Sequence, residues 1–240
     1  MAIVIEGGIQ IGAGISIDRD NLGIVSDGLT LNIDAGDSAS YPGSGSTWTD
    51  LAGTADNITL VGSPTYTSGT PSYFTFNGST QYGTGSGTNV VPTTAYTKVV
   101  WFYLNGYLDN NLVSSSTGGH FLFMGASTNR IYAGHTNWTT LGGSYIDYPS
   151  TGTISLSTWY NVALTFSTTN GMTLYINGSQ DSTYTARKNA HNGNGSTNIA
   201  TFGGGNLLNG RISQVLCYSR ELTAGEVLQN YNATKSKFGL

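Results

Sequence analysis

The chain has 240 residues and a formal net charge of −4, and charged residues make up only 9% of it. So low a share of charge excludes charge-rich coiled coils, and an acidic balance without clustered Lys and Arg argues against binding to a nucleic-acid backbone. Aromatic residues reach 11%, which argues against disorder and predicts a chain that buries a core. The single cysteine, Cys217, leaves no pair for an internal disulfide.

Residues 1–20 differ from the rest of the chain. Their isoleucines alternate with small or polar residues, at Ile3, Ile5, Ile9, Ile11, Ile15 and Ile17. A segment this short cannot build its own core, so we expect these side chains to pack on a partner surface. Two arrangements stay open, an edge strand of the same domain or an arm that pairs with a neighbouring subunit. The segment lacks the basic start and continuous apolar run of a signal peptide, and no signal peptide is predicted.

From residue 21 to residue 240 the sequence predicts one domain of many short strands separated by Gly, Ser, Thr and Asn. The predicted strands are residues 29–34, 73–76, 99–104, 121–124, 130–133, 159–166, 172–176, 198–202 and 211–218. In the sixth of them, Tyr160, Val162, Leu164 and Phe166 fall on one face and are expected to point into a core.

Asn-Gly dipeptides follow three of the strands, at Asn77-Gly78, Asn105-Gly106 and Asn177-Gly178. Each predicts a hairpin, because Asn and Gly accept the positive φ of a type I′ turn. Residues 167–171 are expected to close a further hairpin between two adjacent strands. Many short strands with such turns predict an all-β fold, a two-sheet antiparallel jelly-roll sandwich.

One short helix is predicted near the end of the chain. Thr223 and Glu226 have the spacing of a capping box, in which each side chain accepts a hydrogen bond from an unpaired backbone N–H. Leu222 and Val227 fall at the positions of a hydrophobic staple. We therefore expect a C-terminal helix that packs on the β-domain.

The order of four segments resembles a laminin-G-like, concanavalin A-like lectin jelly roll. These segments are residues 28–34 with 48–51, 76–82, 159–163 with 174–178, and 209–212 with 218–222. The resemblance implies two antiparallel sheets whose concave face or edge loops often bind glycans. The glycine-interrupted start and residues 226–235 are, more narrowly, similar to lectin-like virion proteins of tailed bacteriophages, which decorate heads or form fibres.

Catalysis is not expected. Glycoside hydrolysis generally needs two carboxyl groups about 5 to 10 Å apart, and the alternating acidic strand of the related glucanases does not occur here. Asp34 and Asp37 are close in sequence but are explained by turn chemistry. The histidines, His120, His135 and His191, are far apart in sequence and are expected on the surface or in loops. Cys217 lies in an apolar strand, where a buried and inert thiol is expected.

No cofactor and no metal are predicted. Many laminin-G-like domains use calcium, and Asp34, Asp50 and Asn77 would be the available oxygen ligands. Relatives often carry an Asp after the Gly-x-Ile step, where this chain has Ser213. Calcium therefore stays an alternative that this departure disfavours.

The candidate carbohydrate site lies in the segment that follows residue 134. Sugar recognition uses an exposed aromatic ring together with amides and hydroxyls, and the segment offers His135, Asn137, Trp138, Tyr145 and Tyr148. The alternative is that Trp138 plugs one end of the sandwich. Trp101 and Trp159 are expected in the core, and Trp48 is expected to anchor an early loop.

These features together predict a non-enzymatic structural protein of a tailed-phage particle. Residues 1–20 would attach it to capsid or fibre proteins or to sister subunits, and residues 21–240 would form a lectin-like domain that binds glycans as an optional second role. A homo-oligomer is expected, with no nucleic-acid partner and no membrane insertion, assembled in the host cytoplasm. The alternatives are a receptor-binding lectin on a tail fibre and, less favoured, a glycosidase.

Overall fold

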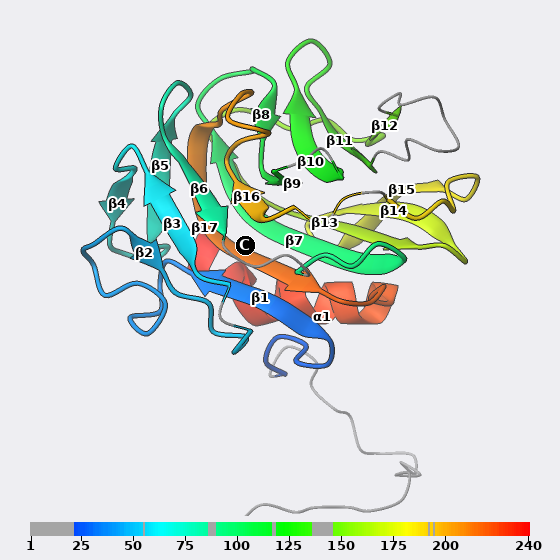
Figure 1. Ribbon diagram of the computed structural model, residues 1–240, viewed down its shortest axis with the longest axis horizontal. Coiled ribbons are helices and arrows are strands. Elements are labelled where there is room, and N and C mark those ends of the chain that lie inside the picture. Colours follow the sequence, from blue (N-terminus) through cyan, green and yellow to red (C-terminus); the bar gives the residue numbers. More distant parts are fainter. Residues whose placement is uncertain are drawn as a thin grey trace, which may run out of the picture.

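The computed structural model is a β-sandwich with one helix on its outer side (Figure 1). It describes residues 22–54, 56–85, 90–116, 119–135, 146–191, 193 and 195–240. The expected arm of residues 1–20 lies outside the described residues. All strand pairs within the described residues are antiparallel, as the sequence predicts.

The first layer is one large sheet built around two long central strands. Its order is β15 (Ser179–Tyr184), β14 (Gly171–Ile176), β13 (Trp159–Ser167), β7 (Ala95–Leu104), β17 (Asn209–Tyr218), β5 (Tyr73–Asn77) and β4 (Thr65–Thr67), and β1 (Leu29–Asp34) also pairs with β17. Side chains alternate along β7, so that Val100 and Phe102 join the core while Val99 and Trp101 face the helix.

The second layer consists of two smaller sheets. One has the order β2 (Thr47–Trp48), β3 (Ile58–Val61), β6 (Tyr82–Gly85), β16 (Thr197–Ile199) and β9 (Val113–Ser115). The other has the order β12 (Ile146–Pro149), β11 (Arg130–His135), β10 (His120–Gly125) and β8 (Asn110–Asn111). Leu112, between β8 and β9, joins them, because its N–H donates to Leu122 and its carbonyl accepts from Ala200.

The main core fills the space between the two layers. Tyr160, Val162, Leu164 and Phe166 of β13 all contact it, as their alternation predicts. Trp48 is fully buried there and packs on Phe74, so the expectation that it anchors the early loop is confirmed. Trp159 is instead half-buried on the outer face of the large sheet, which corrects the expectation of a core residue.

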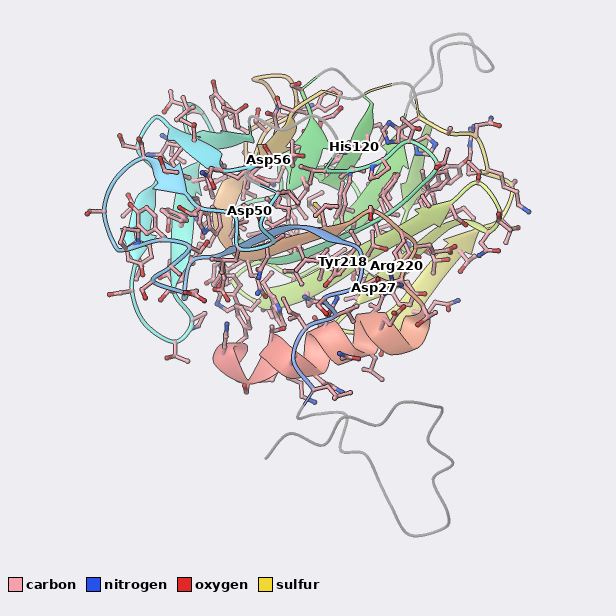
Figure 2. All side chains as sticks on the ribbon, turned by 60° about the horizontal axis from the view of Figure 1, so that its bottom comes forward. Asp27, Asp50, Asp56, His120, Tyr218 and Arg220 are labelled. Carbon is pink, nitrogen blue, oxygen red and sulfur yellow. The ribbon has the colours of Figure 1, made fainter. Side chains whose placement is uncertain are left out.

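The predicted C-terminal helix is α1 (Ala224–Thr234), followed by the 3-10 helix η2 (Lys235–Phe238). Both hydrogen bonds of the capping box form between Thr223 and Glu226. Leu222 and Val227 are buried in a second cluster on the outer face of the large sheet. In Figure 2, Asp27, Tyr218 and Arg220 lie beside α1, whereas His120 lies toward the opposite side of the molecule.

Of the three hairpins predicted at Asn-Gly dipeptides, one is confirmed and two predictions are wrong. Asn177-Gly178 joins β14 to β15 with φ of 50° and 76°, as a type I′ turn requires. At Asn77-Gly78 the chain leaves the large sheet for β6 of the second layer, and Asn77 Oδ1 accepts from the N–H groups of Ser79 and Thr80. Asn105-Gly106 likewise connects β7 to β8 in the other layer. Turn residues predict a reversal, but the sheet that the next strand joins is decided by packing.

Candidate functional site

A pocket of about 520 Å³ opens on the second layer, on the side of β8, β10 and β11 that faces away from the core. Such a volume is in the range of small-molecule sites. Aromatic and polar side chains line it together, chiefly Phe121, Phe123, Tyr132, Phe202, Asp109 and Asn111. The alternate residues Leu122 and Met124 of β10 point the other way, into the core.

Cross-strand register aligns the pocket's central side chains. Phe123 of β10 pairs with Asn111 of β8 on one side and with Tyr132 of β11 on the other. The rings of Phe123 and Tyr132 stack with their centroids 5.3 Å apart and their planes 20° from parallel. Both rings are half-buried, so they keep a surface on which an apolar ligand face can lie.

A tight turn carries Phe202 to the edge of the pocket. Phe202 and Gly205 exchange two backbone hydrogen bonds of 3.0 and 2.9 Å, and Gly203 and Gly204 between them have φ of 57° and 81°. Two central residues with positive φ are the pattern of a type I′ turn, which glycine adopts without strain. The Phe202 ring then packs edge-on to Phe121 at 6.1 Å.

The polar groups of the pocket come from β8 and the residue before it, and from Ser127 and Asn206 on two neighbouring loops. Asn111 is only 2% exposed, and its Oδ1 has no hydrogen-bond partner among the described residues. A buried acceptor without a partner carries a desolvation cost. Asp109 is exposed and holds one oxygen against the N–H of Ala126 at 3.0 Å. Rings, an amide and a carboxylate thus converge on one concavity.

Sequence reasoning placed the site on a different segment. Asn137, Trp138 and Tyr145 of that proposal lie outside the described residues. Tyr148 is half-buried in β12, where its ring packs on Tyr184 at 4.4 Å and its hydroxyl accepts a hydrogen bond from Arg187. The isoleucines proposed for assembly, at Ile3, Ile5, Ile9, Ile11, Ile15 and Ile17, also lie outside the described residues.

His135 is a core residue, and the expectation of surface or loop histidines is wrong for His120 and His135, which lie in β10 and β11, whereas His191 lies in a loop but is buried. His120, His135 and His191 are 2%, 5% and 2% exposed, and they gather around Tyr96. The centroids of His120 and His191 are 5.4 Å apart, and those of His135 and His191 are 5.7 Å apart. The three histidines are distant in sequence. They meet because the pairing of β10 with β11 places His120 opposite His135, and the ring of His191 packs against both.

This histidine cluster is held neutral by its surroundings. Burial lowers the pKa of His135 to about 3 and that of His191 to about 4, and holds the pKa of His120 well below its usual 6.5. His135 bonds the Tyr96 hydroxyl at 3.2 Å and the carbonyl of Asn189 at 2.7 Å. Lys98 is also fully buried in this part of the core, and burial lowers its pKa to about 7.

The remaining residues considered for catalysis or metal binding form local hydrogen bonds or are buried in the core. Asp34 and Asp37 each accept a hydrogen bond from the N–H two residues on, which confirms the turn chemistry predicted for them. Asp50 accepts from the N–H groups of Asn32 and Ala52. Cys217 is fully buried, and burial raises the pKa of its thiol to about 12, as expected of an inert cysteine.

Neither a metal-binding cluster nor a membrane-spanning helix occurs among the described residues. They contain no group of three or more His, Cys, Asp or Glu side chains placed to hold a metal ion. The helices among them include none with the length and hydropathy needed to cross a membrane.

A family model described as the concanavalin A-like lectin/glucanases superfamily matches residues 76–228. The chain belongs to this superfamily. The resemblance to laminin-G-like domains is thereby confirmed, whereas the narrower resemblance to phage virion proteins stays a prediction. No curated protein matches this superfamily member significantly in sequence.

Solved structures of low identity share the superfamily domain's fold. The binding domain of Paraclostridial Mosquitocidal Protein 1 is 17% identical with a TM-score of 0.67, over 87% of this chain and 52% of that one. The binding domain of Botulinum Neurotoxin DC in complex with SialylT is 14% identical with a TM-score of 0.67, again over 87% and 52%. The chain thus spans about half the length of these two relatives.

A third solved structure matches along nearly its full length. Domain 4 of AbnA, a GH43 extracellular arabinanase from Geobacillus stearothermophilus in complex with arabinotriose, is 15% identical with a TM-score of 0.66. The match covers 85% of this chain and 98% of that domain. At such identities the likeness establishes the fold.

Proposed function

We propose that this chain is a lectin-like carbohydrate-binding protein without catalytic activity, and that the pocket on β8, β10 and β11 is its sugar site. The observation that carries the proposal is the stacked pair of Phe123 and Tyr132 beside the unpartnered Oδ1 of buried Asn111. Half-buried rings suit the apolar face of a sugar, and a fixed amide suits its hydroxyl groups. Two of the structures above were solved with SialylT and with arabinotriose, which supports this class of ligand.

The charges around the pocket favour a neutral sugar. Asp109 is the one acidic residue that lines it among the described residues, and no Lys, Arg or His lines it there. An exposed carboxylate accepts hydrogen bonds from hydroxyl groups but repels an acidic sugar. A single carboxylate also lacks the second carboxyl group that glycoside hydrolysis generally needs, which supports binding without turnover.

Glycan binding by three variants tests the proposal. Wild-type protein, Phe123→Ala and Asn111→Ala are compared by calorimetry on arabinotriose and on neutral hexose oligosaccharides that an array selects. We expect each substitution to weaken binding at least tenfold, because each removes a group that contacts the ligand. Leu228→Ala, at an exposed leucine of α1, is the matched control and should bind as wild type does. Binding of no neutral sugar, or unchanged binding by Phe123→Ala, would refute the site, and release of reducing sugar by purified wild type would refute the absence of catalysis.

We also propose that the domain is carried on a tailed-phage particle, assembled in the host cytoplasm as a homo-oligomer that decorates the head or forms a fibre. The support is the alternation of isoleucines in residues 1–20 and the similarity of both chain ends to such proteins. Deletion of residues 1–20 should abolish incorporation into particles and leave a folded domain. Incorporation of the truncated protein would refute this role. A receptor-binding tail fibre is the alternative, and there Trp138→Ala should remove glycan binding without affecting incorporation.

A further inference from the structure

A row of aromatic side chains crosses the outer face of the large sheet, on the layer opposite the pocket. Arg211 of β17 pairs in register with Tyr103 of β7, and Tyr103 pairs with Trp159 of β13. Tyr73 of β5 completes the group, with its ring 5.6 Å from that of Trp159. These four residues, called the outer platform below, are all half-buried and thus keep contact with solvent.

Arg211 is held between two rings of the outer platform. Its guanidinium carbon lies 4.8 Å from the ring centroid of Tyr73 and 4.3 Å from that of Tyr103. Such cation–π contacts fix the plane of the guanidinium and limit its motion. The group is therefore presented in one orientation, which lowers the entropy lost when it binds a ligand.

The charge of Arg211 has no acceptor within the described residues. Its Nε is buried without a hydrogen-bond partner, and no ion pair or hydrogen bond forms at the rest of its guanidinium. The other three arginines of the described residues are all engaged. Arg220 pairs with two carboxylates, Arg130 donates to two carbonyls, and Arg187 donates to the Tyr148 hydroxyl.

Among the described residues, the groups beside the outer platform supply no competing anion. Asp34 accepts from Lys237 of η2 at 2.7 Å and from Gln214 at 3.3 Å, so its charge is already balanced. Phe238 of η2 packs on Trp159 at 5.1 Å and borders the platform with an apolar side chain. The guanidinium of Arg211 is therefore open to an acceptor from outside the described residues, such as an external anion.

We propose that the outer platform is a second binding site, which takes the carboxylate-bearing sugar units of an acidic polysaccharide. One ring face of Trp159 or Tyr103 receives the apolar face of a uronic acid, and Arg211 pairs with its carboxylate. A planar guanidinium matches a carboxylate in two parallel hydrogen bonds, which a lysine cannot do. The platform lies on the outer face of the large sheet, and it is independent of the pocket proposed for neutral sugars.

Polygalacturonate and its fully methyl-esterified form are the probes, because they share one backbone and differ in the carboxylate. Affinity electrophoresis of wild-type protein should show binding to polygalacturonate at least tenfold tighter than to the ester. Arg211→Gln and Trp159→Ala should each weaken binding to polygalacturonate at least tenfold. Arg211→Lys keeps the charge without the planar fork and should fall between wild type and Arg211→Gln.

Controls separate this site from the pocket. Phe123→Ala should bind polygalacturonate as wild type does, and Arg211→Gln should keep wild-type binding of neutral sugar. Thermal melting checks that each variant is folded. If Arg211→Gln does not fold, binding of polygalacturonate by Trp159→Ala tests the site instead. Absence of wild-type binding to polygalacturonate, equal binding to the ester, or equal binding to dextran sulfate would overturn the proposal.

Discussion

Alternate residues of β10 and β11 face two opposite environments. Phe121, Phe123 and Tyr132 open into the pocket, whereas His120 and His135 point into the core beside Tyr96. Both groups combine rings with polar atoms, so composition does not distinguish them. What distinguishes them is the side of the strand, because successive side chains of a strand point to opposite faces.

The polar atoms of the two groups are satisfied differently. In the core, His191 bonds the carbonyl of Pro92 at 3.1 Å and His135 bonds that of Asn189, so both rings are fixed as neutral groups. In the pocket, Asn111 Oδ1 has no partner among the described residues. His120 Nδ1 in the core also lacks a partner among the described residues, so what separates the two groups is position: the histidines are enclosed in the core, whereas Asn111 lines the pocket that a ligand can enter.

Acidification should give the largest effect, and it should act on the core cluster. A histidine whose pKa is lowered by folding binds a proton more readily in the unfolded chain, so stability falls as pH drops below about 6.5. The loss continues toward pH 4 and 3, the pKa values to which burial lowers His191 and His135. Each such group costs about 1.4 kcal/mol per pH unit within this window. Circular dichroism should therefore show unfolding between about pH 5 and 3.

His120→Leu tests whether the cluster causes this acid unfolding. The change removes one buried imidazole, whose Nδ1 has no hydrogen-bond partner in the part of the chain that the structure describes, and puts an apolar side chain of similar size in its place. The acid midpoint should shift to lower pH. An unchanged midpoint would mean that carboxylates elsewhere control acid unfolding and that the histidines do not.

Truncation of two neighbouring residues of β10 should affect different properties, stability at one and sugar binding at the other. Leu122 is fully buried, so Leu122→Ala should lower the free energy of unfolding by about 2–5 kcal/mol in urea. Phe123 is half-buried over the pocket, so Phe123→Ala should cost less stability and weaken sugar binding at least tenfold. A larger stability loss for Phe123→Ala than for Leu122→Ala would break the assignment of the two faces.

The helix and six of the eight strands of the large sheet, all but β4 and β15, were predicted from the sequence. The period of two in β13 gave its core face, and Thr223 with Glu226 marked the start of α1, because these signals are local. Asn77-Gly78 and Asn105-Gly106 misled the prediction, since both join different sheets and a turn signal does not name the next partner strand.

The pocket was not predictable in the same way. Residues 121–124 of β10 are apolar on both faces, so no alternation shows which side is buried. The three histidines are separated in sequence and meet only through tertiary structure. The one available signal was the placement of Phe123 and Tyr132 on adjacent strands, joined by residues 126–129, where a hairpin would set them side by side.

Lys98→Met should raise stability by an amount that depends on pH. Burial lowers the pKa of Lys98 to about 7, so between pH 7 and about 10.4 the unfolded chain binds a proton that the folded chain lacks. Stability of the wild type therefore rises with pH in this range, until the Cys217 thiol, with its pKa raised to about 12, opposes the trend above pH 9. The Met variant should gain on the order of 5 °C in Tm at pH 7 and progressively less toward pH 10. An equal gain at both pH values would show that Lys98 is charged in the folded state.

Gly203→Ala should have the smallest effect, because it changes only the turn that carries Phe202. Gly203 has φ of 57°, which costs a residue with a Cβ about 1 kcal/mol, although no atom lies within 4 Å of the added methyl group. Sugar binding should weaken less than tenfold, since Phe123 and Tyr132 stay in place. Gly23→Ala is the matched control, because its Cβ also meets no atom and its φ is not positive. If Gly203→Ala weakened binding at least tenfold, as is expected of Phe123→Ala, the ring of Phe202, and not the stacked pair, would hold the sugar.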